Sequence, residues 1–364
     1  MKLKSPRRSG LELLRIISMV MIVAAHLSQR GNWAWLNAGS ELTPNQFFMN
    51  IIICFGQVGV AIFFAITGYF LYNSKTYNWK RIFKVLRPTW FYSLLFLIIA
   101  FIIGLPSANF SWPLNSSIAH SLFPITTNAY WFISTYVALY LLFPYLKIWL
   151  DNLNTKKLLR LILILAGLFI IPNLISYIFA DVSSFIFSIP AALFYAIVGY
   201  AAHRYEKQLL IIKNSRLILI NLSGIAIYIL SSIIIHLATT RFGYHNINNN
   251  ILIDTMSLPC MLTSVSLVII FSRMRFINRF INYLASLVFG VYLIHSNGFF
   301  IEYVWQQHDL LRTTTASSYS PLHFLLYFIL TVIIIYLGCS LIEAIRKSCT
   351  QLVFKLFIKQ PKQT

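Results

Sequence analysis

The chain has little charge, and least of all negative charge. Only 10% of its 364 residues are charged, with 9 Asp and Glu against 29 Lys and Arg. Soluble domains carry about 25% charged residues. The low charge excludes an ordinary soluble globular fold, and with 58% hydrophobic residues the composition predicts an integral membrane protein.

Cysteine is also scarce. Cys54, Cys260, Cys339 and Cys349 have no metal-ligand spacing and suggest no disulfide framework, so we expect small packing residues and no metal site. The chain also lacks an internal repeat and a linker rich in Ser, Gly or Pro. A single domain over residues 1–364 is therefore expected, and the missing repeat disfavours a transporter built from inverted halves.

Long apolar runs are abundant. About ten stretches are long enough to cross a hydrocarbon layer of ~30 Å. Their centres lie near Val20, Phe63, Leu97, Leu139, Leu168, Leu193, Ala226, Val265, Leu293 and Ile333. The predicted fold is all-α and polytopic, with spans over about residues 9–345 and a basic tail at 346–364.

The net charge of +20 follows the predicted topology. With a cytoplasmic N-terminus, 25 of the 29 basic residues fall on the cytoplasmic side, and only Arg30, Arg241 and Arg312 fall in outer loops. This is the positive-inside rule, so the charge does not require nucleic acid as a partner. An even number of spans places both termini in the cytoplasm.

The first span carries a polar stripe of Glu12, Arg15 and His26. An arginine near the bilayer centre costs about 2.5–3.5 kcal/mol. Arg15 and His26 are eleven residues apart, which puts them on one helix face about 16 Å apart along the axis. A neutral histidine there is a good general base. Alternatively, Arg15 extends to the inner headgroups and pairs with Glu12.

The second span contains the run GQVGVAIFFAITGYFL from Gly56 to Leu71. It runs from outside to inside, which places Thr67 and Gly68 near its cytoplasmic end. The glycines of this run, Gly56, Gly59 and Gly68, permit close helix approach, so tight helix packing would by itself explain them.

A basic segment follows, with Arg81, Lys84 and Arg87 at intervals of three residues before Pro88. This spacing predicts one basic helix face, which Pro88 helps to bound at the next span. The face suits a phosphate-bearing cofactor from the cytosol, and it equally suits anionic lipid.

Two residues are expected in the outer half of the membrane. Trp131 opens the fourth span, and His295 lies in the ninth at nearly the depth of His26. An interfacial aromatic belt would also explain Trp131, and a structural hydrogen bond would explain His295.

Several sequence blocks occur together in a familiar order. They are Arg15-x10-His26, FFAITGYF, the basic segment before a proline, YWFISTYVALYLLFP and FGVYLIH. Together they resemble the acyltransferase-3 family of integral-membrane acyltransferases. The resemblance implies transfer of an acetyl or other short acyl group from acyl-CoA to a sugar hydroxyl of a surface polysaccharide or lipid-linked glycan. It also implies a bacterial plasma membrane.

The resemblance implies roles for particular residues. Arg15 and His26 are expected to be indispensable. From charge pairing rather than from the resemblance, we assign Glu12 to orienting Arg15 and offsetting its charge. Arg81 and Lys84 match a family Arg-x-x-Arg segment in which the second residue is here lysine, and lysine lacks the bidentate fork of arginine. Thr67 stands where the family commonly has serine.

The sequence predicts a working arrangement from these parts. Arg81, Lys84, Arg87, Thr67 and Gly68 would hold acetyl-CoA on the inner side. Acyl transfer would take place near His26, acting as a base or as a covalent carrier, with Trp131 and His295 at the acceptor. The alternatives are a transporter or flippase, or a polymerase, for a lipid-linked saccharide.

Overall fold

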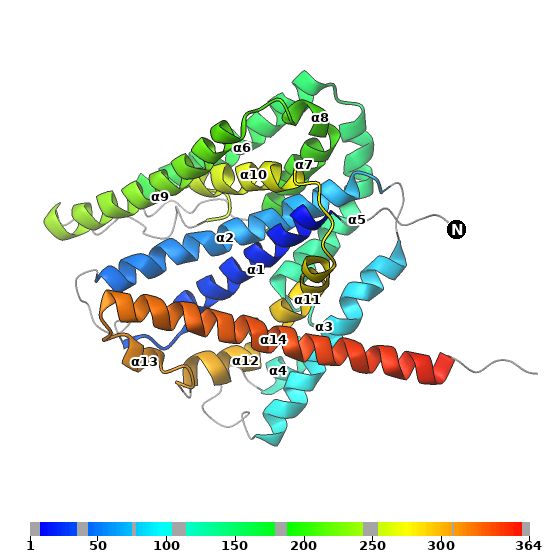
Figure 1. Ribbon diagram of the computed structural model, residues 1–364, viewed down its shortest axis with the longest axis vertical. Helices are drawn as coiled ribbons and strands as arrows, with labels where there is room; N and C mark the ends of the chain where they lie inside the picture. The colour runs from blue at the N-terminus through cyan, green and yellow to red at the C-terminus, as the bar shows by residue number, and fades with distance from the viewer. Residues whose placement is uncertain are drawn as a thin grey trace, which may run out of the picture.

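The computed structural model describes residues 8–34, 43–74, 78–103, 114–178, 188–242, 254–307 and 309–358. All regular structure in these ranges is helical (Figure 1). The helices are α1 (Ser9–Arg30), α2 (Pro44–Leu71), α3 (Trp79–Ile102), α4 (Leu114–Leu122), α5 (Trp131–Asp151), α6 (Thr155–Ile178), α7 (Ser188–Arg204), α8 (Glu206–Leu209), α9 (Asn214–Phe242), α10 (Leu258–Ser272), α11 (Arg279–His295), α12 (Gly298–Phe300), the π-helix η3 (Ile301–Gln307), α13 (Thr313–Ala316) and α14 (Pro321–Ile358).

Six of these helices are long and apolar enough to cross a membrane, namely α1, α2, α3, α5, α9 and α14. A seventh span is possible if α11 and the segment after it count as one, although they meet at a bend of 67°. Each of the ten predicted centres falls inside a helix. The described chain thus supports six or seven spans by length and composition. Two of the helices outside this set, α7 and α10, have only 17 and 15 residues, whereas a span needs ~20.

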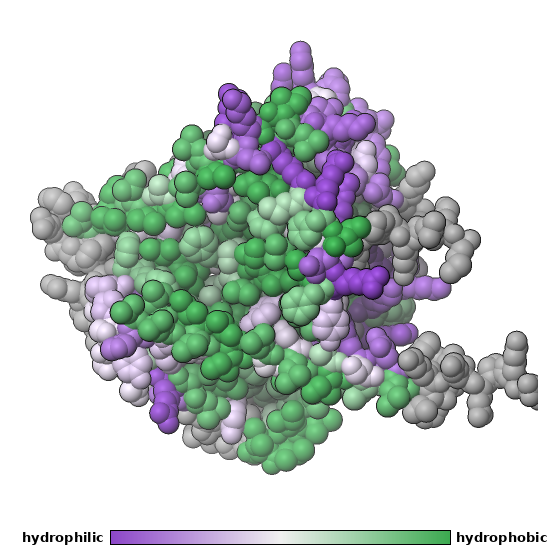
Figure 2. Space-filling model, viewed as in Figure 1, coloured by the Kyte–Doolittle hydropathy of each residue, from purple (hydrophilic) through white to green (hydrophobic). Residues whose placement is uncertain are grey.

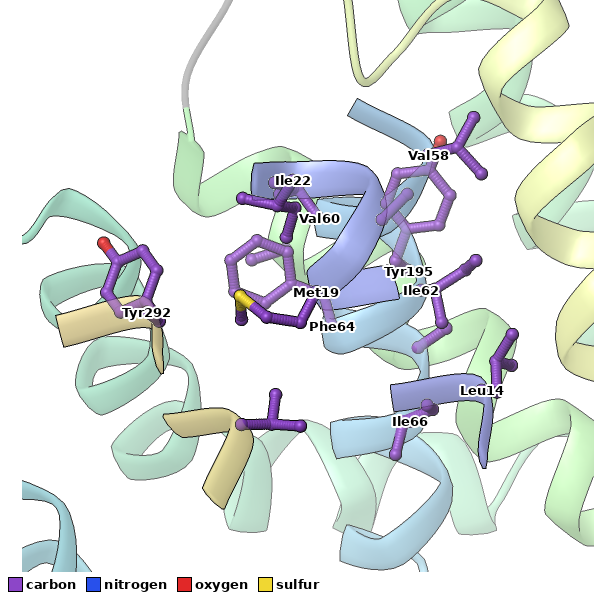
Figure 3. Close-up of a cluster of buried hydrophobic side chains, with 14 of the residues drawn as sticks. Leu14, Met19, Ile22, Val58, Val60, Ile62, Phe64, Ile66, Tyr195 and Tyr292 are labelled. Carbon is purple, nitrogen blue, oxygen red and sulfur yellow. The ribbon is translucent and has the colours of Figure 1, made fainter. Parts of the chain in front are cut away.

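The centre of the molecule is the pair α1 and α2, which lie side by side in Figure 1 with α14 crossing beside them. Lipid tails are as apolar as leucine, so close packing rather than escape from water holds membrane helices together. Figure 3 shows this packing among apolar side chains of α1 and α2, joined by Tyr195 of α7 and Tyr292 of α11.

The contact between α2 and α7 depends on two glycines that face each other's helices. A Cβ added at Gly68 would collide with the backbone of Ala196, and one added at Gly199 would collide with that of Ala65. The small residues allow the two backbones to touch, which a larger side chain at either position would prevent.

The surface separates into an apolar belt and polar ends. In Figure 2 hydrophobic residues cover the middle of the view, while strongly hydrophilic ones gather mainly at the upper right. One polar contact ties the start of α1 to α8, because Arg8 Nη1 donates to Glu206 Oε1 at 2.6 Å. Arg275 also pairs with Glu206, at 3.3 Å.

Two boundaries differ from those predicted. Pro88 was expected to help bound the basic segment, but α3 runs through it from Trp79 to Ile102. Membrane helices tolerate an interior proline, and the next residue, Thr89, donates its hydroxyl to the Val85 carbonyl at 2.8 Å. The last helix likewise continues beyond residue 345, to Ile358.

Candidate active site

A cavity of about 350 Å³ opens where the end of α1 meets the start of α5 and the bend after α11. Two predicted site residues, His26 and Trp131, line it. Its other lining residues are Arg30, His120, Asn128, Ala129, Tyr292, Ser296, Gly298, Ile301, Glu302 and Gln306. The cavity is polar and partly enclosed, as expected of a site for a hydroxyl-bearing ligand.

The imidazole rings of His26 and His295 face each other at this cavity. Their centroids are 5.0 Å apart, with a tilt of 44°. His295 is fully buried, and its Nδ1 lies 2.6 Å from the Val291 carbonyl. Only a protonated Nδ1 can donate to a carbonyl, so this bond places a proton on Nδ1 and fixes the orientation of the ring on its own helix. The structural hydrogen bond considered for His295 is thus present.

His26 differs from His295 in its hydrogen bonding. Its Nδ1 is buried and has no hydrogen-bond partner within the described ranges. Buried polar side-chain atoms are mostly paired, so an unpaired one beside a cavity marks a candidate functional group. The ring has a lone pair or a proton available for a ligand.

The broken helix after α11 positions these groups. Asn297 caps α12, its Oδ1 accepting from Phe299 N at 3.0 Å, and its Nδ2 donates to the Tyr130 hydroxyl at 2.8 Å. Tyr130 in turn donates to the Leu293 carbonyl at 3.1 Å. Trp305 Nε1 donates to the His295 carbonyl at 3.3 Å. These bonds fix the bend, so that η3 turns back to form one wall of the cavity.

The sequence analysis missed several cavity residues. It assigned Arg30 to an outer loop, whereas α1 continues to Arg30. The signal was its spacing of four residues from His26, which places both on one helix face. His120, Glu302 and Gln306 gave no such signal, because only the tertiary fold brings α4 and η3 to His26.

On the inner side, Arg15 pairs with Glu12. Arg15 Nη1 donates to both carboxylate oxygens of Glu12, at 3.2 and 3.1 Å. Glu12 is buried, and the guanidinium carbon of Arg15 lies 5.2 Å from the centre of the Phe70 ring. The predicted pairing is therefore present, and it fixes the direction of the Arg15 side chain.

Arg81 approaches the same region from α3. Its guanidinium carbon lies 5.6 Å from the centre of the Tyr140 ring, and Tyr136 stacks on Tyr140 with centroids 6.4 Å apart. Tyr136 is within electrostatic reach of both Arg15 and Arg81. Tyr140 of α5, which the sequence analysis missed, is thus the aromatic partner of Arg81, and Tyr136 beside it lies within the electrostatic range of both cations.

The other residues predicted to bind acetyl-CoA do not lie together with Arg15 and Arg81. Lys84 and Arg87 are exposed on α3. Thr67 donates its hydroxyl to the Phe63 carbonyl at 2.8 Å, and Gly68 packs on Ala196. The alternative of tight packing accounts for Gly68, and its contact with α7 leaves no room for a ligand on that side.

A further charged group on α14 has no counterpart in the sequence analysis. Glu343 is buried and accepts two bonds from Arg346, both at 2.7 Å, and one from the Tyr92 hydroxyl at 2.7 Å. Lys347 lies 3.9 Å from Glu343 and also donates to Ser286. We call Tyr92, Glu343, Arg346 and Lys347 the α14 network.

Across the described part of the chain, no group of three or more His, Cys, Asp or Glu side chains could hold a metal ion. The cysteines are free, with Cys349 exposed and the other three buried.

Fold and site together define a helical, multi-pass membrane protein with a histidine at a polar cavity. Residues 8–340 match the family model described as an acyltransferase domain. The chain therefore belongs to the acyltransferase-3 family and is a membrane acyltransferase, which confirms the resemblance found in the sequence. Comparison with curated proteins and with solved structures gives no match.

Proposed function

We propose that the protein moves an acetyl or other short acyl group from acyl-CoA to a sugar hydroxyl of a surface polysaccharide or lipid-linked glycan. The observation that carries the proposal is the unpartnered Nδ1 of His26 beside a polar cavity. An imidazole held in this way can take the proton of a hydroxyl as it attacks a thioester. Trp131, 37% exposed at the same cavity, offers a flat apolar face to a sugar ring.

The donor would enter from the opposite end of α1. Arg15 and Arg81 both act electrostatically on Tyr136, and charge-assisted bonds from two such cations suit the phosphates of acetyl-CoA. Arg15 and His26 are about 16 Å apart along the helix. The pantetheine arm would therefore run along α1 to bring the thioester to His26, with Lys84 and Arg87 adding positive charge outside.

In this proposal the protein has about ten spans and lies in a bacterial plasma membrane with both termini in the cytoplasm. The distribution of basic residues supports that orientation. Acyl-CoA would be used at the cytoplasmic side, and the acceptor would reach the cavity from the outside.

The test is mass spectrometry of envelope glycans from a deletion strain complemented with wild-type or His26→Ala protein. We expect wild-type protein to restore ester groups and His26→Ala to restore none, at equal amounts of inserted protein. Arg312→Gln, on the outer side but away from the cavity lining, serves as a control that restores the ester. Loss of the glycan itself in the deletion strain would contradict acyl transfer and favour export or polymerisation.

A further inference from the structure

Arg30 lines the cavity and forms no ion pair with an acidic residue of the described ranges, Glu302 of the same cavity included. It follows His26 by four residues on α1 and lines the same cavity. It has no ion pair and no side-chain hydrogen bond within the described ranges. It is also within electrostatic reach of His26, His295 and Tyr292. A half-buried guanidinium of this kind is costly unless an anion binds to it for part of the time.

The helix geometry directs Arg30 toward the histidine. Side chains on an α-helix lean toward its N-terminus, so a long side chain covers the turn before its own Cα. For Arg30 that turn carries His26. Its position at the end of α1 also suits a cation, since the helix dipole is negative there.

We propose that Arg30 is a catalytic residue that binds the carbonyl oxygen of the acyl group as that oxygen becomes an oxyanion. The inference rests on the proposed function. His26 takes the proton of the acceptor hydroxyl while the hydroxyl oxygen bonds to the acyl carbon. The C=O electron pair moves to oxygen, which Arg30 binds. When this pair returns, the C–S bond breaks, and the CoA thiolate leaves and takes the proton from His26.

The charges favour this arrangement in the transition state only. Before reaction, Arg30 disfavours a second positive charge on His26. As the reaction proceeds, the imidazolium forms together with the oxyanion, so a negative charge lies close to both cations. An interaction that becomes favourable only at this stage raises the rate rather than the affinity.

The experiment uses membrane vesicles from the deletion strain, with labelled acetyl-CoA as the probe and the endogenous glycan as acceptor. For Arg30→Gln we expect the rate at saturating acetyl-CoA to fall about 10²- to 10³-fold, as for loss of an oxyanion donor, with the KM for acetyl-CoA nearly unchanged. The rate of Arg30→Lys should fall less than that of Arg30→Gln. Added guanidinium should partly restore the rate of Arg30→Ala. Arg312→Gln, an outer arginine away from the cavity lining, should keep the wild-type rate.

The outcomes separate the two proposals. If wild-type vesicles transfer no label to glycan, the proposed function fails. If His26→Ala abolishes transfer but Arg30→Gln keeps a near wild-type rate, only the role of Arg30 is overturned. A raised KM with an unchanged maximal rate would also overturn it, because Arg30 would then serve binding alone. If Arg30→Gln fails to insert, two other measurements test the role of Arg30. They are the rescue of inserted Arg30→Ala by guanidinium and the rate of Arg30→Lys; no rescue together with a wild-type rate of Arg30→Lys would overturn the role.

Discussion

The α14 network and the cavity at His26 are two groups of polar side chains that differ in how well their hydrogen bonds are satisfied. In the α14 network both oxygens of Glu343 accept hydrogen bonds from Arg346, and Tyr92 adds a third bond. At the cavity, His26 Nδ1 and Arg30 have no such partners in the described part of the chain. A buried group left unpaired costs about 1–3 kcal/mol. We infer that the network serves stability and that the cavity keeps its unpaired groups for a ligand.

The sharpest way to test this comparison is to replace one titratable side chain in each group. Glu343→Ala leaves Arg346 without its carboxylate, and loss of one partner of a buried pair costs about 3–5 kcal/mol. His26→Gln removes no hydrogen bond and should cost less than about 1 kcal/mol. Chemical denaturation in detergent micelles measures both free energies of unfolding. Equal losses from the two variants would remove the distinction.

A double variant sharpens the same point. Replacing Glu343 and Arg346 together with methionine removes both charges while keeping much of the volume. Exchange of a whole ion pair for apolar residues is often neutral or stabilising. We therefore expect the double variant to regain most of the stability that Glu343→Ala loses. Failure to regain it would show that Tyr92 and Lys347 depend on the carboxylate.

A methyl group tests the network by packing rather than by charge. A Cβ added at Gly290 would collide with the Glu343 side chain, whereas one added at Gly338 of α14 has nothing within 4 Å. Overpacking of this kind costs about 1–3 kcal/mol. Gly290→Ala should lower the unfolding free energy by that amount, while Gly338→Ala should leave it equal or slightly higher. The same denaturation experiment compares them.

Substitutions at the proposed binding site for acetyl-CoA should have a smaller effect, measured as a change in KM. Arg81→Ala should raise the KM for acetyl-CoA several-fold more than it changes the KM for the acceptor, because Arg81 and Arg15 both act on Tyr136 at the proposed binding site for acetyl-CoA. Lys84→Ala should do less, since Lys84 is exposed. Initial rates in vesicles at varied acetyl-CoA measure this. A change confined to the acceptor KM would reject the donor assignment.

The smallest effect concerns the ion pair at the start of α1. Burial opposes ionisation of Glu206, but the hydrogen bond from Arg8 and the charges of Arg8 and Arg275 outweigh it and hold its pKa below the ordinary 4.5. The stabilisation from this carboxylate is therefore present above pH 4.5 and is lost as the pH falls through the lower, folded pKa. Arg8→Gln should flatten that pH dependence, measured as the unfolding midpoint against pH. If the unfolding midpoint of Arg8→Gln depends on pH as in the wild-type protein, the loss of stability in acid belongs to other groups.

Much of the site could be predicted where one helix carries it. The stripe of Glu12, Arg15 and His26 follows from 3.6 residues per turn, and so does the contact of Arg15 with Glu12 one turn away. Arg30 lies on the same face and was missed only because the span was ended too early. The basic face of Arg81 and Lys84 was likewise read from its spacing, although only Arg81 turns to an aromatic partner.

The sequence alone determined the all-helical membrane class and the family, because composition and short ordered blocks need no knowledge of contacts. The tertiary structure alone decided that His295 faces His26, that η3 folds back over them, and that Glu343 is fully paired while His26 is not. Helix periodicity assigns side chains to faces, but the face that meets a neighbour depends on how distant helices pack. That packing brings residues 26, 120, 131 and 302 to one cavity.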